Sequence, residues 1–247
     1  MSTSANSKLN SQLWKQLMSR SKTYKPRLSN VPDFSRFRMM QWDKFGPRDI
    51  KLLRSFNRFN YYGVDTENYL NGGLAFILLA SLNGFVYILQ ESGNMSKCLI
   101  DFLSGENVWI GVGVKRDFFN LKIETTGRFI DSSNAVFKLN SESNLSGIGY
   151  QCFLMYDFDY KPMSNKKYFK RYNCSKPKNL FGRKYPSYPP TLYAWDFSKY
   201  RHEIINYLMS DARIPLLFMA IVGLKIADNE GIKIHTMKEA IDMCENA

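Results

Sequence analysis

Histidine and closely spaced cysteine are scarce in this sequence, which argues against two common kinds of metal site. The 247 residues include only two histidines, His202 and His235, and no Cys-x-x-Cys pair. His202-Glu203 lacks the second histidine of a zinc-binding HExxH helix. The cysteines are Cys98, Cys152, Cys174 and Cys244. We expect four unremarkable reduced thiols, no metal and no required cofactor.

Familiar catalytic motifs are also missing. The sequence has no GxSxG and no GxxxxGK[ST]. Gly111-Val-Gly113 and Gly147-Ile-Gly149 do not complete a GxGxxG and are interpreted as strand glycines at bulges or close approaches. Asp157-Phe-Asp159 would place two carboxylates on one face of a strand, as paired catalytic acids or, in the favoured interpretation, as strand-end acids. We therefore predict that the chain is not an enzyme and has no catalytic residues.

Long apolar runs and an apolar leader are absent too. The longest apolar run, residues 214–224, is about half of the roughly 18 residues that span a bilayer. The first 30 residues are polar and basic. The sequence thus predicts an intracellular chain that does not enter a membrane.

Positive charge and aromatic side chains are abundant, and the charge is unevenly distributed. The net charge is +12, with 15 Tyr, 18 Phe and 4 Trp. Residues 1–60 carry 13 Lys and Arg against 3 Asp and Glu, and residues 161–190 carry 9 against none. These basic segments either bind polyanions such as nucleic acid or bind the acidic remainder of a neighbouring copy.

Residues 161–190 are interpreted as an extended basic arm or long surface loop rich in Tyr and Pro. Cations alternate there with aromatic rings, a mixture that can follow a phosphate backbone and stack on bases, although a solvated loop with local aromatic packing explains it equally well. The candidate polyanion contacts are Lys166, Lys167, Lys170, Arg171, Arg183 and Lys184.

Residues 7–20 are predicted to form an amphipathic helix that docks on another surface, because a helix this short is marginal alone. Its apolar stripe is the candidate assembly surface. The stripe consists of Leu9, Leu13, Trp14, Leu17 and Met18.

Further along, a helix is expected from Pro47, a favoured first helical position. Residues 74–82 and 85–90 are expected to form a hairpin around Asn83-Gly84. A short helix is expected over 98–103, and a helix over 197–209. Thr236 and Glu239 form a capping box for a last helix to Cys244. Further strands are predicted at 108–114, 118–125, 128–130, 135–139 and 150–156, and 214–226 is expected to pair with 232–235.

Together these elements predict a mainly β, α+β fold: an antiparallel β-sandwich with flanking helices and an N-terminal amphipathic helix. We divide the chain into a helix and basic arm over 1–46 and a single sandwich domain over 47–247.

The region 47–140 resembles the cypovirus polyhedrins, the viral proteins that crystallise in infected insect cells and embed virus particles. The resemblance rests on Arg48-Asp49, Phe56-Asn57, Tyr61-Tyr62, Leu70-Asn71-Gly72 and the hairpin at Asn83-Gly84. It implies a homo-trimer packed into a crystal lattice, an N-terminal helix that clasps neighbours, nucleotides between molecules in some members, and no catalysis. The partners expected are further copies of the chain, virus particles, and nucleotides or RNA. The location implied is the host cell cytoplasm, in inclusion bodies.

An occlusion body must dissolve at alkaline pH, and Tyr and Lys titrate near pH 10 to 10.5 in model peptides. The candidate pH-sensing residues are Tyr61, Tyr62, Tyr168, Tyr172, Tyr185 and Tyr188. The alternative prediction is a viral RNA-binding protein, a nucleocapsid or movement protein that uses the basic segments 1–60 and 161–190.

Overall fold

The described part of the chain contains a six-stranded mixed β-sheet. The structure is a computed structural model that describes residues 37–55, 59–69, 73–132, 169–173, 179–180, 183–184 and 191–246. The strand order is β1-β4-β3-β2-β5-β6, where β3 runs antiparallel to β2 and β4 and the other three pairings are parallel. The strands are β1 (Phe37–Gln41), β2 (Tyr61–Asn68), β3 (Leu74–Ser81), β4 (Val86–Gln90), β5 (Val108–Gly111) and β6 (Arg128–Asp131).

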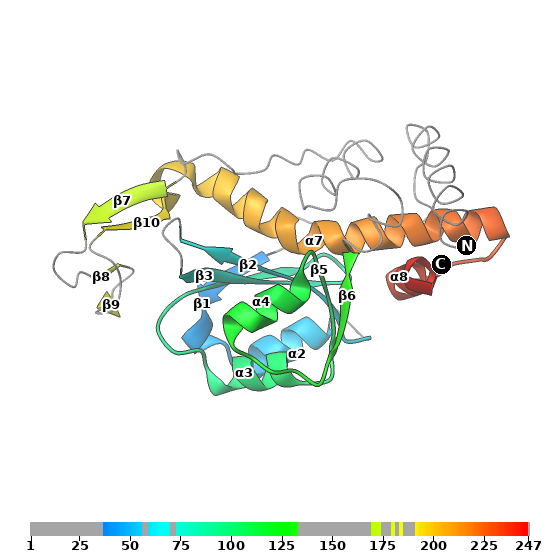
Figure 1. Ribbon diagram of the computed structural model, residues 1–247, viewed down its shortest axis with the longest axis horizontal. Helices are drawn as coiled ribbons and strands as arrows, with labels where there is room; N and C mark the ends of the chain where they lie inside the picture. Colours follow the sequence, from blue (N-terminus) through cyan, green and yellow to red (C-terminus); the bar gives the residue numbers. More distant parts are fainter. Residues whose placement is uncertain are drawn as a thin grey trace, which may run out of the picture.

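Helices cover both faces of this sheet (Figure 1). One face carries α2 (Pro47–Ser55), α3 (Lys97–Ser104) and α4 (Val114–Leu121), preceded by the short 3-10 helix η2 (Trp42–Lys44). The long helix α7 (Phe197–Glu230) crosses the other face, and α8 (Met237–Asn246) packs on α7. Each face has its own apolar core, with Trp109 on the side of α2 to α4 and Trp195 on the side of α7.

Two small ribbons lie apart from the main sheet. β7 (Phe169–Asn173) pairs with β10 (Thr191–Trp195), and β8 (Asn179–Leu180) pairs with β9 (Arg183–Lys184), both antiparallel. The α+β class is therefore confirmed, but the antiparallel sandwich is wrong. Helices cover the central sheet in place of a second stacked sheet, and three of its five strand pairings are parallel.

Several local predictions are confirmed. Gly84 adopts φ 85° in the turn between β3 and β4, and a helix begins at Pro47. At the start of α8 the Glu239 backbone N–H donates to Thr236 Oγ1 (3.1 Å), while the His235 N–H donates to the Glu239 carboxylate (2.7 Å). The first of these hydrogen bonds satisfies one of the N–H groups that a helix end leaves without a partner.

Two predicted strand regions are helical instead. Residues 118–125 were expected as a strand, but Val114, Asp117, Phe118 and Leu121 are the buried residues of α4, which is the spacing of one helical face. Residues 214–226 lie inside α7 and do not pair with 232–235. α7 is buried on most sides in this stretch, so its sequence has no helical period to detect.

α7 is long and apolar enough to cross a membrane by length and composition alone, over Phe197–Asp228, and 88% of its most apolar window is buried inside the protein. A buried core helix passes the same test. The predicted helix over 7–20 and the predicted strands over 135–139 and 150–156 lie outside the described residues. The division of the chain at residue 46 stays a prediction. β1, which lies in the predicted N-terminal segment 1–46, forms one edge of the sheet.

Candidate metal centre

The carboxyl end of β2 presents different side chains to the two faces of the sheet. Successive residues of a strand point to opposite sides, so Tyr62, Val64 and Thr66 face α2 to α4, while Asp65 and Glu67 face α7. β2 pairs with β5 only over Tyr61–Gly63, although its pairing with β3 continues to Asn68. The two acids therefore lie where β2 has a strand partner on one side alone.

A glycine in β2 lets α7 approach this end closely. A Cβ atom at Gly63 would lie 2.0 Å from the carbonyl oxygen of Ala212 and 2.9 Å from Leu216. Real Cβ contacts are never this short, so the backbones of β2 and α7 can touch only because residue 63 has no side chain. This contact brings Asp211, the residue before Ala212, to Asp65.

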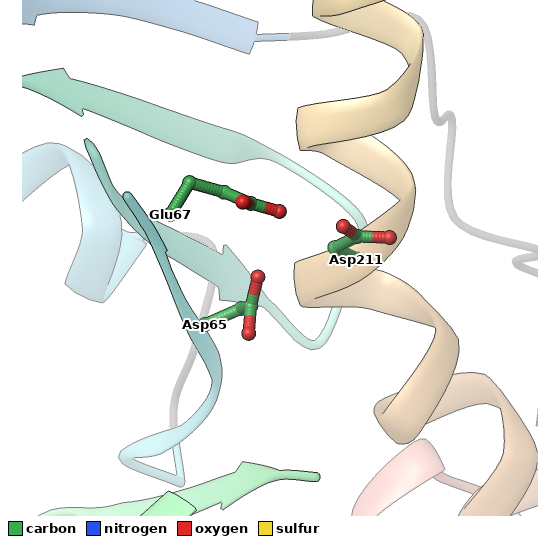
Figure 2. Close-up of side chains that lie close together, drawn as sticks. All are labelled: Asp65, Glu67 and Asp211. Carbon is green, nitrogen blue, oxygen red and sulfur yellow. The ribbon is translucent and has the colours of Figure 1, made fainter. Parts of the chain in front are cut away.

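The side chains of Asp65, Glu67 and Asp211 point toward one another from β2 and α7 (Figure 2). One oxygen from each carboxylate can be chosen so that all three lie within 4.8 Å of one another. Asp211 is buried, whereas Asp65 and Glu67 are only partly covered and keep some contact with solvent.

Asp117 of α4 adjoins this cluster from the other face of the sheet. Its Oδ1 accepts a hydrogen bond from Thr66 Oγ1 (2.6 Å), and Thr66 lies between the two acids of β2. Its Oδ2 is buried with no hydrogen-bond partner among the described atoms. Burial raises the pKa of Asp117 to about 7; the Thr66 hydrogen bond opposes this shift, and the charges of Glu67 and Asp131 add to it.

Tyr207 lies one helical turn before Asp211, on the same side of α7. Its hydroxyl makes hydrogen bonds with the carboxylates of both Asp211 and Glu67. Burial, followed by the negative charges of those two acids, raises the pKa of Tyr207 far above its ordinary value. The phenol therefore stays protonated at neutral pH and acts as a hydrogen-bond donor beside the acids.

The acids strongly disfavour one another's ionisation. Burial raises the pKa of Asp65, and the charges of Glu67 and Asp117 raise it further. Burial and the charges of Asp65 and Glu67 raise the pKa of Asp211. Burial also raises the pKa of Glu67, whereas hydrogen bonds with Asp211 and Tyr207 lower it. Such a cluster must hold protons or a positive ion.

The donor set suits a small divalent cation. Mg²⁺ and Mn²⁺ prefer carboxylate oxygens, and opposite ligands of an octahedral Mg²⁺ are roughly 4 Å apart, which is twice the metal–oxygen distance. The three carboxylate oxygens lie within 4.8 Å of one another, so they need to move only slightly to coordinate one ion. The unpaired Oδ2 of Asp117 offers a further ligand at the border of the cluster. The residues present therefore fit a metal.

The residues singled out from the sequence do not meet at this site. Tyr61 donates a hydrogen bond to Asp242 Oδ1 (2.8 Å), and Tyr62 is buried in the core under α2 to α4. His202 and His235 are exposed, Cys98 is a partly buried free cysteine, and the buried Cys244 thiol donates to Met219 Sδ (3.7 Å). Lys170, Arg171 and Tyr172 belong to β7, and Arg183 and Lys184 to β9. The remaining candidates lie outside the described residues, namely Leu9, Leu13, Trp14, Leu17, Met18, Lys166, Lys167, Tyr168, Tyr185 and Tyr188, together with Asp157 and Asp159.

Sequence reasoning missed all five site residues, although a signal was present. Asp65-Thr66-Glu67 has the spacing that attracted attention at Asp157-Phe-Asp159, and it follows a buried apolar run. Tyr207 and Asp211 have the spacing of one helical turn. Asp117 was hidden because the residues after it were interpreted as a strand.

No protein-family model and no curated protein matches the sequence. Among solved structures, the chain is similar to NrnC from Brucella melitensis, a nuclease (TM-score 0.51, 12% identity, 85% of this chain and 89% of NrnC covered). It shares the fold of NrnC.

A second NrnC structure, with bound Mg²⁺, is similar at TM-score 0.50 and 12% identity, with the same coverage. An EXD2 exonuclease domain soaked in Mn and GMP follows at TM-score 0.38 and 15% identity, covering 85% of this chain and 95% of that domain. At these identities the NrnC comparisons show the fold alone.

These findings overturn the resemblance to polyhedrins and what it implied. The chain shares the fold of NrnC, a nuclease, so the predictions of a polyhedrin, a trimeric crystal lattice and virus particles as partners are wrong. The acidic cluster and the Mg²⁺ bound in the NrnC structure contradict the predictions of a non-enzymatic chain and of no required cofactor. The alternative, a viral RNA-binding protein, finds no support either. The predicted location in cytoplasmic inclusion bodies stays a prediction.

Proposed function

We propose that this protein is a metal-dependent exonuclease that hydrolyses phosphodiester bonds at the end of a nucleic-acid strand. The observation that carries the proposal is the convergence of Asp65, Glu67 and Asp211 from β2 and α7, with Asp117 at the border. In chain order these four residues read Asp-Glu-Asp-Asp. The shared fold with NrnC, which has been observed with bound Mg²⁺, supports the proposal.

The carboxylates would hold one or two divalent ions against the scissile phosphate. Bound there, such ions supply a water nucleophile at neutral pH and neutralise charge on the attacking and leaving oxygens. Asp65, Glu67 and Asp211 fix the ions through oxygens that the fold has already brought together. Because deprotonated carboxylates are the ligands, metal binding releases the protons that the raised pKa values retain.

Tyr207 supplies a hydrogen-bond donor to the site. Its hydroxyl lies at the oxygens of Glu67 and Asp211, where a water that attacks phosphorus would also be held. A neutral phenol there can donate one hydrogen bond and orient that water while a carboxylate accepts the proton of the water. In the metal-free protein, burial and the charges of Asp211 and Glu67 raise the pKa of Tyr207 and keep the phenolic proton in place.

The test is release of mononucleotides from end-labelled single strands of DNA and RNA with Mg²⁺ or Mn²⁺. We expect Asp65→Asn and Asp211→Asn to lower kcat on the order of a hundredfold or more, because each removes a charged ligand that stabilises the transition state. Glu203→Gln is the matched control, since Glu203 is an exposed acid of the same helix. Its activity should equal that of the wild type.

Metal binding is measured separately from turnover. Mg²⁺ should raise the Tm of the wild type and of Glu203→Gln but not that of Asp211→Asn, since an ion that binds the folded state stabilises it. A wild-type protein that releases no nucleotide with either metal, or an Asp211→Asn variant with full activity, would refute the proposal.

A further inference from the structure

The outer face of α4 carries an exposed aromatic ring. Phe119 is 81% exposed, the largest exposed fraction among the exposed large apolar side chains of the described residues. Its neighbour Phe118 is buried in the core beneath α4, so the helix already has an anchor there. An exposed phenylalanine adds nothing to the stability of α4, and an exposed apolar side chain on a charged surface commonly marks a contact.

Positively charged side chains flank this ring. Lys115 and Arg116 precede Phe119 by four and three residues, so all three share one face of α4, and Lys122 follows at the end of the helix. All three cations are exposed. Among the described residues none of them forms an ion pair. The face therefore combines an open ring with three cations that form no salt bridge among the described residues.

The same helix supplies Asp117 to the candidate metal centre. Asp117 lies on the buried side of α4 and Phe119 on the exposed side, so one helix diameter, about 10 Å, separates the ring from Asp117, and the other three acids lie beyond it on the α7 side of β2. Arg116 is near enough to Asp117 to oppose the rise of its pKa. In Figure 1, α4 lies in front of the sheet on the side away from α7, which leaves its outer face uncovered by any labelled element.

We propose that Lys115, Arg116, Phe119 and Lys122 form a binding surface for an unpaired nucleic-acid strand, on the same helix that supplies Asp117 to the acidic site. The cations contact phosphates and the ring of Phe119 stacks on a base. This inference rests on the exonuclease function proposed above and adds a second contact region to it.

The chemistry of the face favours a single strand over a second copy of the chain. In a symmetric contact between two copies, Lys115, Arg116 and Lys122 would face the same cations, and the chain as a whole carries a net charge of +12. A phosphate backbone complements these charges. A base that is not paired has an open face for stacking, and aromatic side chains stack on bases of any sequence.

Strand affinity is measured first without catalysis. A short unstructured oligonucleotide with a fluorescent label is titrated in EDTA, and anisotropy reports the bound fraction over a series of salt concentrations. Phe119→Ala should weaken binding about five- to a hundredfold, the range for the loss of one stacked base. The double variant Lys115→Ser/Arg116→Ser should make the slope of log affinity against log salt less steep, by about 0.7 for each phosphate that the variant no longer neutralises.

The salt dependence of binding thus distinguishes the two variants, because stacking depends little on salt.

Matched controls come from elsewhere on the surface. Ile232 is an apolar side chain with 43% exposure, and Lys51 and Lys97 are exposed cations of α2 and α3. Ile232→Ala and Lys51→Ser/Lys97→Ser should retain the affinity and salt slope of the wild type.

Cleavage then tests whether the surface serves the acidic site. The ratio of kcat/KM for a long oligonucleotide to kcat/KM for a dinucleotide should fall roughly tenfold or more in Phe119→Ala. Unchanged affinity in Phe119→Ala would overturn the surface alone, whereas a wild-type protein that binds strands but cleaves none would overturn the exonuclease function. A wild-type oligomer that Phe119→Ala converts to a smaller species in sedimentation would overturn the surface in favour of contact between copies.

Discussion

The indole of Trp195 stacks on the ring of Tyr207, with centroids 5.9 Å apart and planes 23° apart. The same indole donates its N–H to the carbonyl oxygen of Asn68 (3.3 Å), the residue after Glu67. Trp195 thus contacts both elements that carry the acidic cluster, α7 through Tyr207 and β2 through Asn68. Phe76 packs edge-on against it from β3.

This contact predicts that Trp195→Phe lowers kcat on the order of tenfold, because a ring that is shifted misplaces the Tyr207 hydroxyl. Removing the hydrogen bond to Asn68 costs about 1 kcal/mol of unfolding free energy. Trp109→Phe is the control, since Trp109 is a buried tryptophan of the opposite core whose N–H reaches Thr125 Oγ1 at 3.4 Å. Urea unfolding and steady-state kinetics check both variants. Equal kcat values in the two would show that Trp195 only fills the core.

Gly63→Ala should separate β2 from α7. The added methyl would meet the Ala212 carbonyl oxygen at 2.0 Å, so the helix must move and Asp211 moves with it. We expect a loss of about 1 to 3 kcal/mol of unfolding free energy and a weaker Tm response to Mg²⁺.

Gly46→Ala is the control for this change, because a Cβ atom there would lie 3.9 Å from the nearest carbonyl oxygen, an ordinary contact. The close approach would be disproved if Gly63→Ala unfolded at the same urea concentration as Gly46→Ala.

The metal-free protein should lose stability as pH rises. The pKa of Asp117 is raised to about 7 from 3.8, so folding keeps a proton that the unfolded chain releases between those values. This contribution is complete below pH 3.8 and disappears as pH rises through about 7. In EDTA, the Tm of the wild type relative to that of Asp117→Asn should therefore fall between about pH 4 and pH 7. A constant difference across this range would mean that Asp117 is not perturbed.

Tyr61 and Tyr62 should respond oppositely to loss of the hydroxyl. Tyr61 donates to Asp242 and accepts from Arg128 (3.1 Å), so Tyr61→Phe should cost about 1 to 3 kcal/mol. The Tyr62 hydroxyl is buried with no hydrogen-bond partner among the described atoms, and its pKa is raised to about 12, chiefly by burial. Tyr62→Phe should be neutral or stabilising, because it removes a polar group that lacks a partner. The urea concentrations at which the two variants are half unfolded test this prediction.

Local signals predicted those elements whose cause lies within a few residues. Asn83-Gly84 specified the hairpin, Pro47 the start of α2, and Thr236 with Glu239 the start of α8. The sheet order was out of reach, because β1 pairs with β4 and β2 with β5 through contacts distant in sequence.

The meeting of β2 and α7 at the site was out of reach for the same reason, although the spacing of Asp65 and Glu67 is itself visible in the sequence. Asp65 and Asp211 meet only because Gly63 admits α7, and nothing near either acid in the sequence indicates the other. The resemblance to polyhedrins rested on common residue types in the region 47–140, where the strand and helix order alone does not distinguish a sandwich from a sheet covered by helices.

The burial of α7 also has a consequence for biosynthesis. The six strands of the sheet precede α7 along the chain, so a ribosome makes the whole sheet before it makes the helix that covers one of its faces. Until then the apolar side chains that pack under α7, Phe76, Leu78 and Ile88 among them, remain in water, and α7 itself emerges as a long apolar segment. Chains that stop before α7 would expose this surface and aggregate. They would also lack Asp211, so synthesis completes the apolar core and the acidic cluster in the same step.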